Sequence, residues 1–515
     1  MNQKIGRRSF FGRASALASL TGGLAGGVEA LHAAQKPGAR PQSIIWMVAD
    51  GMSPSVLPLA EQFSLRVRNG RGLVWQELLN QPRVQRGWMD MASLDSMVTD
   101  SSSASSAWGS GSRIFNGWVN VLPDGTKLTP IAQLARDKRK RIGLVTTATV
   151  THATPAGFAA VSRNRDNEAL IAEQYLKVAD VVLGGGRKFF DAKTRADKRD
   201  LIGDFRADGF GYAASRDQLM KLTSSKMLGL FSASHMPYTL DQRNSETDRA
   251  LVPTLAEMSE VALKALSGGP NGFLLQIEGG RVDHAAHAND AASLLWDQLA
   301  FDEAIEVVLR YAERHPETLI VLTSDHGNAN PGLNGMGTEY RDSTKCFDRL
   351  AGVKSSFYAI SPQLGASTGY TMKTDTAAAV VAKPAAERVQ ELARTHFGFE
   401  LTPDEVELLR SAVSGQKRLS ANKQLDSLSG LMGQVVGNHA GIGWTGSSHT
   451  SDYTLVTALG PGAERFAGMI RNTQVFPALT GLMDVKFQNP SMEPERAKQF
   501  REAAALQRRE RPDWA

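Results

Sequence analysis

Six short apolar runs lie along the chain, and polar residues suited to chemistry adjoin each of them. The first run spans residues 43–49 and leads directly into Asp50 and Gly51. The others lie at 141–147, 180–183, 273–277, 319–323 and 453–459. Continuous apolar runs of this length are typical of strands that are covered on both faces, as in a parallel sheet. The pattern therefore predicts a central, mostly parallel sheet.

Helical patterns lie between these runs, for example over residues 291–314. Strands that alternate with helices predict an α/β fold, here a three-layer α/β/α sandwich. In open parallel sheets, binding sites form beyond the carboxyl ends of the strands. Most of the polar candidates described below follow such a strand, so we expect them to meet at one edge of the sheet.

A long stretch between His326 and His449 has a different character. At Thr402-Pro403-Asp404-Glu405 it carries an N-cap threonine, a proline at the first helical position and a glutamate placed to complete a capping box. Alanine-rich and amphipathic segments lie around it, at 376–382 and 385–395. We interpret about 330–445 as a mainly helical insertion near the site, within one domain that spans 41–515.

The N-terminal residues 1–34 have the features of a bacterial twin-arginine export signal. The pair Arg7-Arg8 precedes a mildly apolar stretch at 14–28, and small residues at 30–34 could form a cleavage site. The stretch is too short and too polar for a stable membrane span, and no other segment resembles one. We therefore expect a periplasmic or secreted protein, although a basic tail without a targeting role is the alternative.

Composition narrows the function classes further. The chain has 515 residues, 42% of them hydrophobic, and a formal net charge of +5 without a long basic run. No electrostatic footprint for nucleic acid is present. Cys346 is the one cysteine, so an internal disulfide framework is excluded.

The segment from Glu278 to His287 is a candidate metal-binding element. If Asp283 and His287 lie on a helix, they are four residues apart and share one face. A carboxylate and an imidazole placed in this way can bind one zinc ion, and Glu278 at the strand end could serve a second ion. A solvated polar turn with incidental histidines remains the alternative for this segment alone.

Further candidates adjoin other strands: Asp50, the pair Asp325-His326, and His449. An aspartate before a glycine is common in turns, and a single histidine is often only hydrogen-bonded. Together with Asp283 and His287, however, these residues supply three carboxylates and three imidazoles. That set is sufficient for two zinc ions with open coordination positions.

Ser101 is the candidate nucleophile. It follows Thr99-Asp100 and opens a Ser- and Ala-rich stretch that is compatible with a helix. A serine hydroxyl needs a base or a metal to become reactive, and no Gly-x-Ser-x-Gly elbow surrounds it, so metal activation is the better account. A helix start here would also favour bound phosphate through its free N–H groups. A flexible serine-rich linker is the alternative.

Taken together, these motifs resemble the alkaline phosphatase family. Asp50-Gly51-Met52, Thr99-Asp100-Ser101, the motif at 152–156, the motif at 278–284, Asp325-His326-Gly327 and His449-Thr450 occur in that family's order. The resemblance extends from about residue 50 to 461. It implies hydrolysis of phosphate monoesters through a phosphoserine on Ser101, with two Zn²⁺ ions and one Mg²⁺ ion as cofactors.

The resemblance also implies roles for the other residues. The first zinc would be bound by Asp283, His287 and His449, the second by Asp50, Asp325 and His326, and the magnesium by Asp50, Thr154 and Glu278. Arg163 resembles the arginine that clamps the phosphate, although it comes two residues early, and Arg165 could take that role. His152 and His284 resemble the histidine-bearing type and would lie around the phosphate and the magnesium.

Other functions remain open from the sequence. A phosphodiesterase of the same metalloenzyme superfamily is the main alternative, and it would be favoured if neither arginine reached the phosphate. A sulfatase would need a Cys/Ser-x-Pro-x-Arg setting, which surrounds neither Cys346 nor Ser101. A binding protein without catalysis is a further class. The resemblance also makes a homodimer possible.

Overall fold

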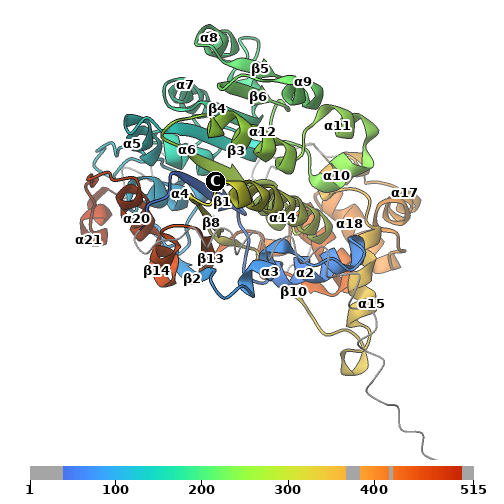
Figure 1. Ribbon diagram of the computed structural model, residues 1–515. Helices are drawn as coiled ribbons and strands as arrows, with labels where there is room; N and C mark the ends of the chain where they lie inside the picture. The colour runs from blue at the N-terminus through green and yellow to red at the C-terminus, as the bar shows by residue number, and fades with distance from the viewer. Residues whose placement is uncertain (1–38, 367–382, 417–420, 501–515) are drawn as a thin grey trace, which may run out of the picture.

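The computed structural model describes residues 39–366, 383–416 and 421–500, and its centre is a ten-stranded sheet (Figure 1). The strand order is β14-β2-β13-β8-β1-β7-β3-β4-β6-β5. The strands are β1 (Ser43–Val48), β2 (Gln85–Asp90), β3 (Arg141–Thr149), β4 (Val181–Gly185), β5 (Gly211–Ala213), β6 (Met227–Leu230), β7 (Phe273–Glu278), β8 (Thr318–Thr323), β13 (Thr454–Leu459) and β14 (Gly468–Arg471).

Within this sheet, β13 runs against its two neighbours, β8 and β2, while all other neighbouring pairs are parallel. The prediction of a mostly parallel sheet is therefore confirmed, but the sixth apolar run forms its antiparallel strand. An apolar run indicates that both faces of a strand are covered, but it does not indicate the direction of the strand.

Each face of the sheet packs against its own layer of helices. Along β1, Ile45 and Met47 point into one core while Ile44, Trp46 and Val48 point into the other, and all five are fully buried. The first core is covered by α2 (Val56–Val67), α3 (Val74–Leu79), α12 (Leu255–Ser267) and α14 (Ala291–Arg314), and the second by α4 (Ser101–Ser110), α5 (Ile131–Asp137), α6 (Ala153–Ala159), α7 (Glu168–Val178), α8 (Leu201–Ala207) and α20 (Val475–Leu482). The predicted α/β/α sandwich is confirmed.

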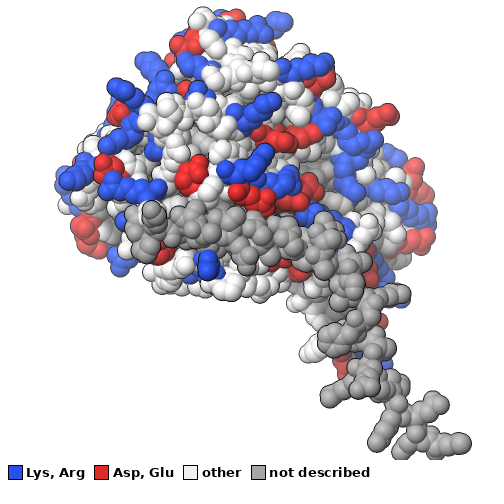
Figure 2. Space-filling model, viewed as in Figure 1, with Lys and Arg blue, Asp and Glu red and all other residues white. Residues whose placement is uncertain are grey.

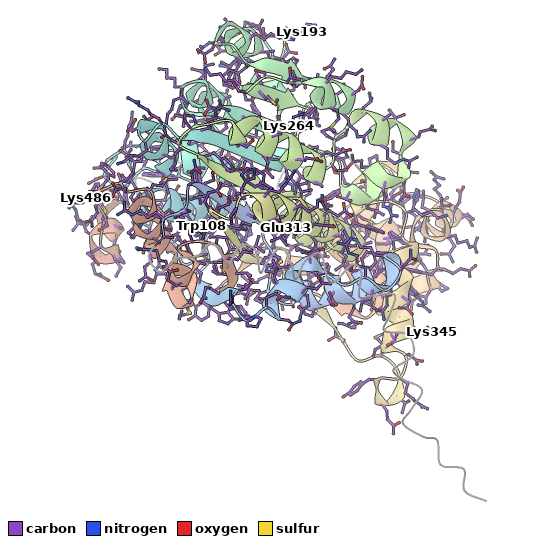
Figure 3. All side chains as sticks on the ribbon, in the orientation of Figure 1. Trp108, Lys193, Lys264, Glu313, Lys345 and Lys486 are labelled. Atoms are coloured by element: carbon purple, nitrogen blue, oxygen red, sulfur yellow. The ribbon has the colours of Figure 1, made fainter. Side chains whose placement is uncertain are left out.

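The surface layer carries charges of both signs. Figure 2 shows Lys and Arg interspersed with Asp and Glu over the face drawn there. Two ion pairs join the residues after α2 to α14: Arg68 Nη2 lies 2.7 Å from Glu303 Oε1, and Arg71 Nη2 lies 2.8 Å from Glu306 Oε2. Trp108, which Figure 3 labels inside the molecule, is fully buried against Trp46 at a centroid distance of 5.2 Å.

After β8 the chain leaves the sheet and returns only at β13. In between lie two small antiparallel pairs, β9 (Gly327–Asn328) with β12 (His449–Thr450) and β10 (Gly332–Leu333) with β11 (Ile442–Gly443). The helices of this stretch are α15 (Ser343–Asp348), α16 (Phe357–Ile360), α17 (Ala386–Leu392), α18 (Pro403–Val413) and α19 (Leu428–Ala440). The boundaries 330–445 stay a prediction, and the expected segment 376–382 lies outside the described residues.

Local signals in this stretch act as the sequence indicates. Thr402 caps α18, with its Oγ1 accepting from the Glu405 backbone N–H at 3.3 Å, and the Glu405 carboxylate accepts from the Thr402 N–H at 2.9 Å. The capping box is confirmed.

The remaining helices lie at the edges of the sandwich and around the strand ends. They are α9 (Arg216–Lys221), α10 (Thr239–Asn244), α11 (Glu246–Leu251), α13 (Arg281–His287) and α21 (Pro494–Ala497). None of the helices in the described ranges is long and apolar enough to cross a membrane. The export signal expected at 1–34 lies outside those ranges.

Candidate active site

Neighbouring strands bring the first candidate residues together. In the register of the sheet, Val48 of β1 pairs with Glu278 of β7 on one side and with Thr323 of β8 on the other. Asp50 therefore emerges between Glu278 and the Asp325-His326 pair at the carboxyl edge of the sheet. Gly51 follows at a φ of +63°, and a Cβ there would lie 2.3 Å from Asp283 Oδ1. A larger residue would push the loop away from α13.

The first cluster consists of Asp283, His287 and His449, whose ligand atoms all lie within 4.8 Å of one another. Asp283 and His287 are on α13, as predicted, and His449 arrives on β12. His287 Nδ1 is 2.7 Å from the Ser447 carbonyl, and His449 Nδ1 is 2.8 Å from the Thr99 carbonyl. Because carbonyls only accept, both Nδ1 atoms carry the proton in the neutral rings.

That arrangement leaves the two Nε2 atoms facing each other, 3.0 Å apart, with Asp283 Oδ2 3.4 Å from His287 Nε2. Burial, followed by the charge of His326, lowers the pKa of His449 to about 3, so its ring is neutral. Two lone pairs and a carboxylate that converge in this way repel one another unless a cation lies between them. The donor set and its carbonyl anchors therefore fit a zinc ion.

The second cluster consists of Asp50, Asp325 and His326, again within 4.8 Å. All three are fully buried. Neither carboxylate oxygen of Asp50, nor Oδ2 of Asp325, has a hydrogen-bond partner among the described residues. Burial and the carboxylates of Asp325, Asp283 and Glu278 raise the pKa of Asp50 well above its usual value. Buried carboxylate oxygens without hydrogen bonds are costly, and a divalent cation would offset that cost.

The third cluster joins Asp50 and Glu278 to His152. Glu278 Oε1, His152 Nδ1 and the Thr154 hydroxyl are all buried without hydrogen-bond partners in the described part of the chain. Burial raises the pKa of Glu278 to about 7, and burial together with Arg165 lowers that of His152 to about 3. Asp50 and Glu278, two of the three oxygen ligands expected for magnesium, thus lie together, and His152 adds a neutral imidazole beside them.

Ser101 is the first residue of α4 and is 1% exposed. Its Oγ lies 3.1 Å from His326 Nε2. Asp100 caps the helix, accepting from Ser103 N at 2.8 Å and from Gly117 N at 2.7 Å. The serine-rich stretch is therefore a buried helix and not a linker.

The small side chains of this helix serve its packing. Helix α4 lies directly against α6, so that a Cβ on Gly109 would come within 2.0 Å of the Gly157 carbonyl oxygen. Ser105 Oγ donates to the Thr154 carbonyl at 2.6 Å. This close contact fixes Ser101, on α4, relative to Thr154 and His152 at the start of α6.

The two candidate arginines lie in different places. Arg165 is buried, with Nη1 3.2 Å from Asp100 Oδ2 and Nη2 3.1 Å from His152 Nε2. Arg163 is exposed, and its guanidinium lies 5.6 Å from the ring of Trp118. The structure therefore brings Arg165 to the clusters and leaves Arg163 at the surface.

One further histidine near the site, His235, escaped the sequence interpretation. His235 follows β6 in a loop, and its ring centroid is 4.4 Å from that of His284 and 5.6 Å from that of His152. Its Nδ1 accepts from the Thr149 N–H at 3.2 Å. Burial is the main cause that lowers the pKa values of His235 and His284, so the rings are neutral. The sequence offers little indication of this role, because His235 lies five residues after β6 and within no motif.

Known proteins share this fold and sequence. The family model described as "Alkaline phosphatase" matches residues 41–484. The crystal structure of Thermus thermophilus alkaline phosphatase is 34% identical, with a TM-score of 0.82, covering 92% of this chain and 98% of that one. The cold-active alkaline phosphatase from Shewanella sp. is 28% identical, with a TM-score of 0.69, covering 86% and 99%. Alkaline phosphatase 4 of Bacillus subtilis is 28% identical over 89% of this chain and 93% of its own.

Proposed function

The chain belongs to the alkaline phosphatase family and hydrolyses phosphate monoesters, and on that premise we propose that Ser101 is its nucleophile. The observation that carries this proposal is the position of Ser101 Oγ, 3.1 Å from His326 Nε2 and at the first residue of a capped helix. The family is metal-dependent, and the clusters next to Ser101 are suited to metal ions.

We propose zinc for the first two clusters and magnesium for the third. Asp283, His287 and His449 would hold one zinc ion, and Asp50, Asp325 and His326 the other. Asp50, Thr154 and Glu278 would hold magnesium, next to His152. When bound, the ions supply positive charge that favours the deprotonated forms of Ser101 and of water and that neutralises the leaving oxygen. Magnesium prefers oxygen ligands, whereas His152 offers a ring nitrogen to the third cluster. Metal analysis of the purified protein is therefore most informative for that cluster.

The chain's own residues would carry the transfer in two steps. As Ser101 Oγ forms a bond to phosphorus, its proton passes to water, the bond from phosphorus to the ester oxygen breaks, and the leaving oxygen takes up a proton from water to give the alcohol. Water then attacks the phosphoserine and loses a proton to solvent, the bond from phosphorus to Oγ breaks, Oγ regains a proton, and inorganic phosphate is released. The transition state is loose, so positioning and charge neutralisation dominate. The free N–H groups of α4 would contribute to both.

Arg165 would hold the non-bridging phosphate oxygens. Asp100 and His152 orient its guanidinium, which presents a planar fork suited to a phosphate. A monoester dianion carries more charge on these oxygens than a diester does. The buried arginine therefore favours monoesters.

Three further proposals concern the chain outside the clusters. Residues 1–34 would direct export by the twin-arginine pathway to the periplasm or the exterior. Replacing Arg7 and Arg8 with lysine should retain the protein in the cytoplasm, which cell fractionation would show. The stretch 330–445 would shape access to the site. The protein would form a homodimer, which sedimentation analysis of the purified chain would detect.

The decisive assay compares a chromogenic phosphate monoester with the matching diester. We expect the monoester to be the better substrate, chelation to abolish turnover, and zinc with magnesium to restore it. Ser101→Ala should be inactive while still binding zinc. Preferred cleavage of the diester would overturn the role of Arg165, and an active Ser101→Ala variant would overturn the nucleophile.

A further inference from the structure

A cavity of about 710 Å³ opens beside the active site. Its walls come from the loop after β6, from α10 and α11, from the start of α13, and from residues 354–362 around α16. Helices α10 and α11 lie on the right-hand side of Figure 1. None of the residues assigned above to nucleophile or metal lines this space, so it has no role in the transfer as described so far.

Arg281 is the unusual group in this cavity. It is 4% exposed, and its Nε has no hydrogen-bond partner among the described residues. Nη1 lies 2.8 Å from His284 Nδ1, and the guanidinium carbon lies 3.7 Å from the ring centroid of Tyr238. A guanidinium stays protonated at any physiological pH. This one is a buried cation: burial lowers its pKa to about 10, and the carboxylates of Asp297 and Asp241 counteract that shift.

The nearby carboxylates have other partners. Asp241 accepts from the Ser356 N–H at 2.8 Å and from its hydroxyl at 2.5 Å. Asp297, outside the cavity lining, accepts from the Thr239 hydroxyl at 2.8 Å. Asp248, which also lines the cavity, is partly exposed to solvent. Asp297 and Asp241 therefore offset the cost of burying the Arg281 charge only in part, and an anionic group in the cavity would offset more of it.

The rest of the lining favours an organic ligand. Met236, Pro237, Tyr238, Tyr358 and Pro362 contribute apolar and aromatic surface. Lys354 is exposed and adds a second positive charge. Binding pockets combine such an apolar wall with a few polar groups that fix orientation.

The cavity adjoins the active site through one layer of histidines. His235 lines the cavity, and the ring of His284 packs against the ring of His235. The ring centroid of His284 also lies 5.5 Å from that of His152. Arg281 and the metal-cluster residues Asp283 and His287 share the short helix α13. The organic part of a bound monoester would thus have the cavity beside it.

We propose that this cavity binds the anionic end of the organic part of the phosphate monoester, with Arg281 and Lys354 as its recognition groups. This inference rests on the function proposed above. It makes monoesters that carry a carboxylate or a second phosphate on the alcohol side the preferred substrate class. The same chemistry would also suit a separate anion, and the experiment below distinguishes the two sources.

The test compares ω-carboxyalkyl phosphates of increasing chain length with neutral alkyl phosphates of equal length. We expect kcat/KM of the wild type to favour the carboxylate series at the lengths that reach Arg281. Lys354→Glu should lower kcat/KM for those substrates about threefold or more and leave the neutral series within about twofold. Arg281→Gln should reduce the preference about tenfold or more, because a charged hydrogen bond is lost.

Lys193→Glu is the matched control, because it reverses an exposed lysine that Figure 3 places at the top of the molecule, by α8. It should leave the preference unchanged. If Lys354→Glu and Lys193→Glu behave alike, or if no chain length is preferred, the proposal is overturned, even if Arg281→Gln fails to fold.

Calorimetry with the product hydroxy acids separates this proposal from the proposed function. If neither series is hydrolysed, the function fails, but hydroxy-acid binding that is weakened by Lys354→Glu would still support an anion-binding cavity. If the hydroxy acid binds without competing against its own phosphate ester, the cavity binds a separate anion. The proposal that it holds part of the substrate is then overturned.

Discussion

Two equally buried aspartates show how the active site differs from the scaffold that holds it. Asp302 on α14 is 1% exposed, and it accepts from the backbone N–H groups of Val74 and Trp75 at 3.1 and 3.0 Å and from Arg68 at 3.2 Å. Asp50 is 0% exposed, and neither of its oxygens has a hydrogen-bond partner among the described residues, although Oδ1 lies 3.7 Å from His326 Nε2. The scaffold satisfies its buried charge with protein donors, whereas the site leaves its charge available for a ligand.

The same substitution at the two positions should therefore have opposite effects. Asp50→Asn should reduce kcat/KM about 10³-fold or more, equivalent to about 4 kcal/mol of transition-state stabilisation, without destabilising the metal-free protein. Asp302→Asn should lower the free energy of unfolding by about 1–3 kcal/mol and leave kcat/KM of the folded fraction nearly unchanged. Steady-state kinetics and denaturant unfolding measure both. Equal losses of stability in the two variants would contradict the comparison.

Arg165 and Arg163 extend the comparison of site and scaffold to the binding of phosphate. Arg165→Ala should reduce kcat/KM for a monoester about 10²-fold, because two charge-assisted hydrogen bonds to phosphate are lost. Arg163→Ala should stay within about twofold, since it removes only a surface contact with Trp118. Monoester kinetics of the two variants test this, and a larger loss from Arg163→Ala would return the role to that residue.

Metal removal should destabilise the site more than the scaffold. Ions that bind only the folded state stabilise it, so chelation should lower Tm of the wild type. In Asp50→Asn the shift should be smaller, because that residue belongs to two of the clusters. Thermal unfolding with and without chelator provides the measurement, with Asp302→Asn as control. That control should keep the full wild-type shift.

The sequence specified the scaffold and most of the site for identifiable reasons. Residues 291–314 form α14 as expected, because a long amphipathic pattern that follows the N-cap residue Asp290 favours a helix. Asp50, Glu278 and Asp325 meet because parallel neighbouring strands end at one edge of the sheet. These predictions used periodicity and strand ends, which are local properties.

What the sequence missed depends on long-range contacts. Strand β2 has the sequence QRGWMD, which contains no apolar run, and its Trp88 is 45% exposed. The search for apolar runs therefore missed it. Arg163 and Arg165 are chemically identical, and only the packing of their loop decides which one meets Asp100. His235 reaches His284 through a loop whose path no local pattern indicates.

The smallest expected effect is on the pH dependence of stability. Glu278, with its pKa raised from 4.5 to about 7 by burial, binds more protons when folded. Its contribution to the stability of the metal-free protein is therefore fully present at low pH and declines as pH rises from about 4.5 to about 7. Denaturant unfolding against pH should show a shallower decline for Glu278→Gln than for the metal-free wild type. An unchanged slope would contradict the raised pKa.

The most direct test of the central claim is to identify the residue that is phosphorylated during turnover. Protein mixed with a phosphate monoester, quenched in acid and digested should yield a phosphopeptide that contains Ser101. The Ser101→Ala variant should yield none and should not turn over. Phosphate found on another residue, or turnover that persists in Ser101→Ala, would contradict the account.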